Sequence, residues 1–262
     1  MYIFFISMIS GASAADSAGC FLNTVWGDIK AAGSDGLFMA GNALHPSTAG
    51  MISISATIAG TALCATIDDE VRSLALRNRT DKGVKFFDVT NEFGDVYKVG
   101  LFTGGLYLTG LISGSDEIRT TARLAAESAL LSGLITTSLK YIIGRARPVT
   151  NEGNDSFHWF EIEDRYESLP SGHSTATMAV ITVIAGRIDR WWAYGLYAIP
   201  AVTMMSRIYR DGHWFSDVFA GAAIGTLSGI AVLNAEESGN KPANTGLLIL
   251  PDGYGILLSY RF

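Results

Sequence analysis

The sequence predicts an all-α protein: a helical bundle of about six main helices, membrane-embedded or membrane-associated, with a short C-terminal β-hairpin. Apolar residues make up 48% of the chain and charged residues only 17%, a share below the roughly 25% of soluble domains. Long apolar runs recur along most of its length. The 29 glycines, with many Ala, Ser and Thr residues, favour helices that pack closely together.

The bulk composition also limits the size and the partners of the protein. A chain of 262 residues is long enough for one sizeable domain with its own core. The net charge of −6 argues against nucleic acid as a partner, because a polyanion selects basic surfaces. The mean hydropathy of +0.27 lies between that of a soluble protein and that of a dense membrane protein.

The N-terminal segment, 1–15, predicts a signal peptide or an N-terminal anchor. Residues 2–9 are mostly apolar, and the tripeptide Ala-Ser-Ala at 12–14 resembles a signal-peptidase site. Because no Lys or Arg precedes the apolar run, an uncleaved anchor is the alternative. The two cysteines, Cys20 and Cys64, could pair in an oxidising compartment, but two unpaired thiols are the expectation.

Helical segments are expected in order along the chain. Residues 16–94 form an N-terminal helical and loop segment, in which 21–46 show little periodicity and 67–83 are polar and helix-like. Residues 95–235 form the core domain. The main helices fall at 49–66, 98–115, 121–143, 174–186, 191–205 and 215–233.

Residues 236–262 form a linker and a β-hairpin tail. Two apolar runs flank the turn sequence Pro-Asp-Gly at 251–253. The alternation that ends at Phe262 also resembles the last strand of an outer-membrane barrel. Such a barrel needs at least about eight strands, so a hairpin packed on the helical domain is the expectation.

Two cations mark the end of the helix predicted at 121–143. Lys140 and Arg147 are two helical turns apart and are therefore expected on one face, before Pro148 ends the helix. Cations at the end of an apolar helix need water or an anion. Alone, this pattern equally fits a helix end whose long side chains reach the solvent.

A polar helix start follows at Pro170-Ser171-Gly172-His173. Ser171 is a plausible N-cap, and Gly172 lets the backbone approach a ligand closely. Free N–H groups at a helix start attract phosphate and similar anions. The alternative is a capped helix with an incidental histidine.

A third cluster joins the last two helices. Ser206 and Arg207 close one helix, and His213 and Asp217 open the next, at positions i and i+4 of one face. A carboxylate there would bind one imidazole nitrogen and raise the basicity of the other, as a nucleophilic histidine requires. A surface ion pair is the alternative. In an up-and-down bundle all three clusters meet on one side, where three cations suit a dianionic phosphoryl group.

The ordered pattern Lys-x6-Arg-Pro, Pro-Ser-Gly-His and Ser-Arg-x5-His-x3-Asp resembles the type 2 phosphatidic acid phosphatase superfamily over 95–235. Its members include lipid phosphatases, bacterial non-specific acid phosphatases and vanadium haloperoxidases. The resemblance implies a catalytic core at 95–235 and a phosphoric monoester hydrolase that needs no metal or cofactor. It would act through a phosphohistidine on phosphate monoesters or pyrophosphates, chiefly of lipids.

The resemblance also implies a role for each matched residue. His213 would attack phosphorus, with Asp217 orienting it, and His173 would protonate the leaving oxygen and then activate water. The groups that would bind the phosphate are Lys140, Arg147, Ser171, Gly172 and Arg207.

Substrate and location keep their alternatives. A soluble periplasmic acid phosphatase acting on small phosphomonoesters is the main alternative, followed by a vanadium-dependent haloperoxidase and a non-catalytic binding protein. Arg187 and Arg190 lie between two apolar helices, so the positive-inside rule places the three clusters on the periplasmic face of a bacterial-type envelope membrane. Six crossings that place the clusters there require a cytoplasmic start, whereas a cleaved signal leaves a periplasmic start. Either 1–15 is not a cleaved signal, or one weak run (49–66 or 98–115) does not cross, or the whole domain is periplasmic. The acidic, aromatic loop 149–168 is expected to shape the mouth of the pocket or to be merely solvated.

Overall fold

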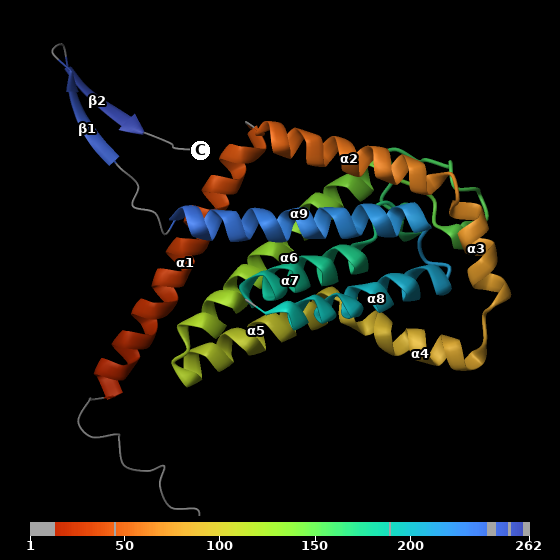
Figure 1. The fold of residues 1–262 in the computed structure, drawn as a ribbon, viewed down its shortest axis with the longest axis horizontal. Helices are drawn as coiled ribbons and strands as arrows, with labels where there is room; N and C mark the ends of the chain where they lie inside the picture. Colours follow the sequence, from red (N-terminus) through yellow and green to blue (C-terminus); the bar gives the residue numbers. More distant parts are fainter. Residues whose placement is uncertain (1–13, 45, 189, 240–244, 251–252, 259–262) are drawn as a thin grey trace, which may run out of the picture.

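The computed structural model describes residues 14–44, 46–188, 190–239, 245–250 and 253–258, and its described helices form one elongated bundle (Figure 1). The α-helices are α1 (Ala14–Leu44), α2 (Thr48–Ala65), α3 (Asp68–Arg77), α4 (Asp81–Asn91), α5 (Val96–Ser113), α6 (Asp116–Ile143), α7 (Gly172–Arg187), α8 (Ala198–Tyr209) and α9 (Phe215–Gly239). Short 3-10 helices are η1 (Glu92–Gly94), η2 (Pro148–Thr150), η3 (Asp164–Tyr166) and η4 (Trp191–Tyr197).

The all-helical prediction is confirmed, and α2, α5, α6, α7 and α9 lie on predicted segments. Two details of the prediction are wrong. A continuous helix, α1, covers most of 21–46, where a buried ion pair of 2.7 Å between Asp35 and Arg123 of α6 holds it; periodicity cannot reveal such a contact. The segment 191–205 begins as η4, and α8 starts late enough to place Pro200 in its first turn, where proline is tolerated.

The helices α7 and α9 meet backbone to backbone. Gly221, Gly225 and Gly229 recur every four residues along the face of α9 that contacts α7. A Cβ atom on Gly225 would lie 2.4 Å from the carbonyl oxygen of Thr175, and one on Gly221 would lie 2.5 Å from that of Ser171. Small residues at this spacing allow two helices to approach closely. Around this contact, α5, α6, α7 and α9 supply a buried core of Val99, Leu124, Ala125, Val180, Val183 and Val232.

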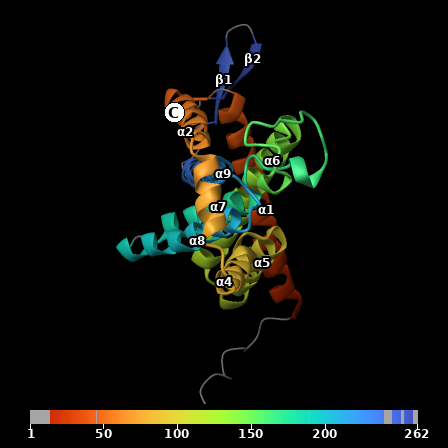
Figure 2. The same ribbon diagram turned by 90° about the vertical axis from the view of Figure 1, so that its right-hand side faces the viewer.

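The predicted meeting of helix ends is visible in the bundle. The last turns of α6 and α8 and the first turns of α7 and α9 lie at the same end, beside α3, on the right of Figure 1. Figure 2 views the molecule from that end, with the loop between α6 and α7 in green at the upper right. The three sequence motifs are therefore carried to one end of the molecule.

Two helices of the described chain are long and apolar enough to cross a membrane. In α2, the apolar window of 18 residues has a mean hydropathy of 1.5 and no buried residue. In α9, the window has a mean hydropathy of 1.7 and is 44% buried within the bundle. An apolar helix without a buried face suits a lipid environment, whereas α9 also serves as a core helix.

Two short strands follow α9. The strands β1 (Thr245–Leu250) and β2 (Gly253–Leu258) pair antiparallel, with Thr245 opposite Leu258. They lie in the segment for which a hairpin is predicted, and the turn residues 251–252 are outside the described residues. The packing of this tail on the bundle stays a prediction.

Most of the predicted signal peptide or anchor, 1–13, also lies outside the described residues, as does the side chain of Cys20. Cys64, in α2, has a free thiol. Cleavage of a signal therefore stays a prediction.

Candidate active site

The first motif extends beyond its helix. The helix α6 ends at Ile143 because Gly144 adopts a left-handed conformation (φ 59°) and donates its N–H to the carbonyl of Lys140 at 2.9 Å. Lys140 is therefore in the last turn of α6, whereas Arg147 is in the loop beyond it. The prediction that both lie on one helical face is wrong, because a glycine ends the helix before Pro148.

His213 lies in the turn between α8 and α9, with only 3% of its surface exposed. Its Nδ1 is 2.7 Å from the carbonyl oxygen of Ser168. Because a carbonyl oxygen only accepts hydrogen bonds, Nδ1 carries the proton and Nε2 keeps its lone pair. Asp217 is 3.9 Å from Nδ1, too far for a hydrogen bond. The predicted direct contact on one helical face is wrong, since His213 precedes α9.

Asp217 is instead bonded to the groups that surround His213. Its carboxylate accepts from the hydroxyl of Ser168 at 2.5 Å and from the backbone N–H of Trp214 at 2.9 Å. It also pairs with Arg145 Nη1 at 2.6 Å, and its side chain is fully buried. Asp217 therefore reaches His213 through Ser168, whose carbonyl is the imidazole's acceptor.

Arg145 and Asp68 extend this network to the N-terminal segment. Arg145 Nη2 is 2.8 Å from a carboxylate oxygen of Asp68, the first residue of α3. Asp68 also accepts from the backbone N–H of Ser216 at 2.8 Å and so binds the start of α9. Sequence reasoning missed both residues. A second arginine so close to Arg147 was the available signal for Arg145, whereas Asp68 stands far from the motifs and offers none.

His173 is the second residue of α7 and packs against η1. A Cβ atom on Gly94 would lie 2.6 Å from the Cβ of His173, so a glycine is needed there for the two segments to touch. Burial, and then the positive charge of Arg207, lowers the pKa of His173 to about 4, against an opposing influence of Asp95. The imidazole is therefore neutral near pH 7 in the empty site.

Two of the predicted cations come from the first motif. The ammonium of Lys140 donates to the carbonyl of Glu167, and a Cβ atom on Gly172 would lie 4.0 Å from the Lys140 stem. The guanidinium of Arg147 pairs with Asp164 at 2.8 Å, and Asp164 is 87% exposed. Both cations thus lie next to the start of α7. The partner of Lys140 is a neutral carbonyl, and that of Arg147 is an exposed carboxylate, which contributes little to stability.

The third cation, Arg207, is in the last turn of α8. It donates through Nη1 to Asn91 of α4, while its buried Nε has no partner among the described residues. A Cβ atom on Gly212 would lie 2.9 Å from Arg207 Nη2, and Arg147 Nη1 donates to the Gly212 carbonyl at 3.3 Å. The two guanidinium groups therefore meet beside the residue that precedes His213.

Both histidines respond to the same three cations. Burial lowers the pKa of His213 well below 6.5, and Arg207, Lys140 and Arg147 lower it further. The same three residues contribute to the lowered pKa of His173. The fold therefore brings the charged residues of all three motifs into one electrostatic environment.

The N-cap position of α7 is confirmed for Ser171, but the expected side-chain cap is absent. Its hydroxyl instead accepts from Ser174 at 3.0 Å, and its backbone N–H donates to the Asp217 carbonyl at 3.0 Å. The N–H of Gly172, in the first helical turn, has no intrahelical acceptor. The start of α7 is thereby fixed to the start of α9 and keeps N–H groups for an anion.

A family model described as the PAP2 superfamily matches residues 121–239, the stretch that holds all three motifs. Over these residues the chain is similar to the PAP2 superfamily. The predicted resemblance is confirmed. Asp68 and Asn91 contact the PAP2 segment from outside this match. The predicted boundaries of the core, 95–235, stay a prediction.

Curated relatives of the PAP2 segment are phosphatases. The lipid A 1-phosphatase of Porphyromonas gingivalis is 34% identical over 104 residues, which are 38% of this chain and 20% of that protein. The lipid A 1-phosphatase of Rhizobium johnstonii is 37% identical over 100 residues, which are 37% of this chain and 41% of that protein. The match thus spans less than half the length of either relative.

One solved structure shares the fold. The crystal structure of Aquifex aeolicus LpxE superposes with a TM-score of 0.52 at 23% sequence identity. The superposition covers 64% of this chain and 95% of that chain. The helical arrangement around the PAP2 motifs is therefore common to both proteins.

Proposed function

We propose that this chain is a metal-independent phosphatase that hydrolyses a phosphate monoester or pyrophosphate of a lipid through a phosphohistidine intermediate. One observation carries the proposal: His213 and His173, both largely buried, experience the same three cations. Two imidazoles and three cations are what a phosphoryl group needs when it passes from a leaving oxygen to a nucleophile.

His213 is the nucleophile in this proposal. Its low pKa keeps the ring neutral, and the hydrogen bond from Nδ1 to Ser168 leaves the Nε2 lone pair free. As the bond from Nε2 to phosphorus forms, the bond from phosphorus to the lipid oxygen breaks. The positive charge that develops on the ring is stabilised by the Ser168 carbonyl and, one hydrogen bond further, by Asp217.

His173 is the general acid and then the general base. A phosphate dianion beside it raises its pKa from about 4, because an opposite charge favours the imidazolium. It gives its proton to the leaving lipid oxygen. It then takes a proton from the water that attacks the phosphohistidine, which releases phosphate and restores His213.

The phosphate oxygens are held by Lys140, Arg147 and Arg207, with the N–H of Gly172 and the hydroxyl of Ser171. Arg207 Nε is buried without a hydrogen-bond partner in the described part of the chain and can donate to an oxygen of the substrate. Arg147 has only an exposed carboxylate as its charged partner and can exchange it for phosphate. Each cation can therefore turn to the substrate without breaking a buried ion pair.

The lipid nature of the substrate is supported by the apolar surface next to the site. Trp159, Phe160 and Ile162, in the loop between α6 and α7, are 60–77% exposed. We assign this loop to contact with acyl chains. The names of the two lipid A 1-phosphatases favour lipid A 1-phosphate among the possible lipids.

We further infer that the site faces the periplasm. Arg187 is the last residue of α7 and Arg190 directly precedes η4, at the opposite end of α7 from His173. Positive residues between membrane helices favour the cytoplasmic side. In a chain that carries Cys20→Ser and Cys64→Ser, the variant Arg190→Cys would then be labelled by a membrane-impermeant maleimide only after the inner membrane is opened.

The test of function is phosphate release by the full chain in non-ionic detergent with EDTA. The panel is lipid A 1-phosphate, phosphatidic acid, phosphatidylglycerol phosphate, undecaprenyl pyrophosphate and p-nitrophenyl phosphate. We expect at least one lipid to exceed p-nitrophenyl phosphate by about 100-fold in kcat/KM, because remote binding energy is used at the reacting centre. Vanadate should inhibit. Equal rates on soluble esters would favour the soluble acid phosphatase, and bromide oxidation with vanadate and peroxide would favour the haloperoxidase.

A further inference from the structure

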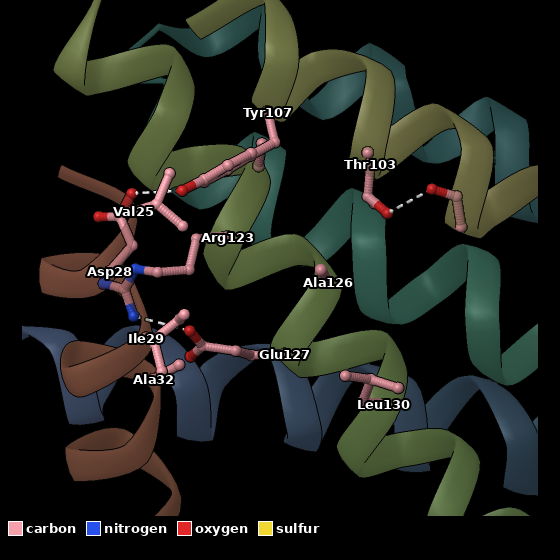
Figure 3. A pocket seen from close by; sticks show the side chains of 13 residues that line it. Val25, Asp28, Ile29, Ala32, Thr103, Tyr107, Arg123, Ala126, Glu127 and Leu130 are labelled. Atoms are coloured by element: carbon pink, nitrogen blue, oxygen red, sulfur yellow. Dashed lines mark hydrogen bonds and ion pairs between the residues drawn. The ribbon is translucent and has the colours of Figure 1, made fainter. Parts of the chain in front are cut away.

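A second site lies far from the phosphatase motifs, in a cleft of about 460 Å³ between α1, α5 and α6. Arg123, at one end of the cleft, precedes Lys140 by 17 residues on α6. At 1.5 Å per residue, the two sites are about 25 Å apart along this helix. Figure 3 shows Tyr107, Arg123 and Glu127 pointing toward α1 at one end, and Ala126 and Leu130 along the cleft.

The charged end of the cleft is lined by two carboxylates, Asp28 and Glu127, and one cation, Arg123, whose further ion-pair partners lie behind them. Arg123 pairs with Asp35 and Glu127, each at 2.7 Å, and with Glu236. A second pair joins Asp28 to Arg119 at 2.9 Å.

Tyr107 also donates to Asp28, at 2.7 Å, and the exposed Asp116 gives Arg119 another acidic partner. Leaving that exposed residue aside, two arginines face four largely buried carboxylates.

Three atoms of this cluster are buried without a hydrogen-bond partner among the described residues. They are Glu127 Oε2, Arg123 Nε and Arg119 Nε, and Glu127 Oε2 is the one acceptor among them. The side chain of Arg123 is only 7% exposed, and that of Glu127 is 12% exposed. A carboxylate oxygen hidden from water and lacking a donor is costly. A donor that reaches Glu127 from the cleft would remove this cost.

The rest of the cleft is apolar and opens between exposed apolar side chains. On its rim, Ile29 is 54% and Leu130 is 69% exposed. Gly100 and Gly104 of α5 line the cleft, and a Cβ atom on either would meet nothing within 4 Å. The volume corresponds to roughly fifteen water-sized groups. An alkyl chain of ten to twelve carbons is therefore of the right size.

We propose that this cleft binds a long-chain primary amine, with its ammonium group donating to Glu127 and its alkyl chain along α5 and α6. The excess of buried carboxylates selects a cation over an anion. The apolar walls and rim select a chain that arrives from a lipid phase. The site is separate from the phosphatase centre, so its binding does not depend on the proposed function.

The test is binding of dodecylamine to the full chain in a maltoside detergent at pH 7, measured by native mass spectrometry and equilibrium dialysis. Dodecanol and dodecanoate have the same chain with a neutral and an anionic head. We expect one dodecylamine per chain, bound at least about tenfold more tightly than either. Glu127→Gln should remove the preference for the amine and leave dodecanol binding unchanged.

A matched pair of glycine variants locates the site. Gly104→Leu fills the cleft, whereas Gly105→Leu places the same side chain beside it, on the next residue, also where a Cβ meets nothing within 4 Å. We expect dodecylamine binding to be lost only in Gly104→Leu, with p-nitrophenyl phosphate hydrolysis equal in both. Equal affinity for dodecylamine and dodecanol would overturn the proposal, as would equal losses in the two variants. A change of oligomer mass in Gly104→Leu without any probe binding would identify a subunit interface instead.

Discussion

At the scale of the residue, the tautomer of His213 follows from a single backbone acceptor. The carbonyl of Ser168 determines which ring nitrogen carries hydrogen, and burial among cations keeps the ring neutral. Asp217 contributes by holding the hydroxyl of the same serine. His213 and Asp217 are thus joined through Ser168, a residue that the motifs do not include.

The first prediction concerns the nucleophile. His213→Ala should lower kcat by at least about 10³-fold and abolish the acid-labile phosphoenzyme, because the proposed nucleophile is removed. Trapping with ³²P-labelled substrate and rapid quenching measures both. His158→Ala is the control, since His158 is partly exposed and paired with Glu152. Phosphoenzyme in His213→Ala at the wild-type level would rule out the mechanism.

The second prediction concerns the general acid. His173→Ala should slow phosphoenzyme formation by about 10²–10⁴-fold with an alkyl phosphate, whose leaving oxygen needs a proton. With p-nitrophenyl phosphate the loss should be much smaller, because nitrophenolate leaves unprotonated. Single-turnover rates for both substrates provide the comparison. Equal losses with the two substrates would assign His173 to phosphate binding rather than to proton transfer.

At the scale of the element, Asp68 of α3 fixes the start of α9. Its carboxylate accepts from the N–H of Ser216 and pairs with Arg145. We predict that Asp68→Asn reduces kcat with little change in KM, because Arg145 loses one of its two carboxylate partners and shifts the Asp217 network that supports His213. It should also reduce the free energy of unfolding by about 3–5 kcal/mol, as when one partner of a buried ion pair is removed. Thermal unfolding and steady-state kinetics measure the two effects.

Asp35→Asn is the matched control for this third prediction. Asp35 is also buried and paired with a buried arginine, but it lies on α1 and its partner is Arg123 of α6, away from the motifs. It should reduce stability by a similar amount and leave kcat unchanged. A parallel loss of kcat in both variants would show that α3 only stabilises the fold.

The sequence alone predicts a large part of this element arrangement. The apolar periodicity locates α5, α6, α7 and α9, and the order of three motifs identifies the family and the helix ends that meet. Spacing within a motif is less informative. Arg147 and His213 both lie outside the helical faces on which their spacing from Lys140 and Asp217 places them, because Gly144 ends α6 and α9 begins only at Phe215.

The remaining features depend on contacts between distant parts of the chain. Asp68 and Asn91 hold Arg145 and Arg207 from a segment without any motif, and no local pattern marks such partners. The helix α1 depends likewise on the buried partner of Asp35. Local propensity cannot predict an element that a tertiary contact stabilises.

At the scale of the whole molecule, the buried histidines make stability depend on pH. The pKa of His173 is about 4 in the fold, compared with 6.5 when unperturbed. Between these values the unfolded chain binds more protons, so the free energy of unfolding should rise with pH from 4 to 6.5. We predict that the difference in Tm between pH 4.5 and 6.5 is smaller in His173→Gln than in the wild type. An identical difference would mean that His173 is protonated in the fold.

The contact between α7 and α9 has a consequence for how such an enzyme can diversify. His173 is the second residue of α7 and His213 lies two residues before α9, so the close contact at Gly221, Gly225 and Gly229 sets the spacing of the two helices that carry them. These glycines set the distance between His173 and His213, across which the phosphoryl group is transferred in the proposed mechanism. Loops and outer helix faces can change to suit another lipid while this distance stays constant. The distance between the proposed acid, His173, and the proposed nucleophile, His213, is thus set by the absence of side chains at the three glycines of α9.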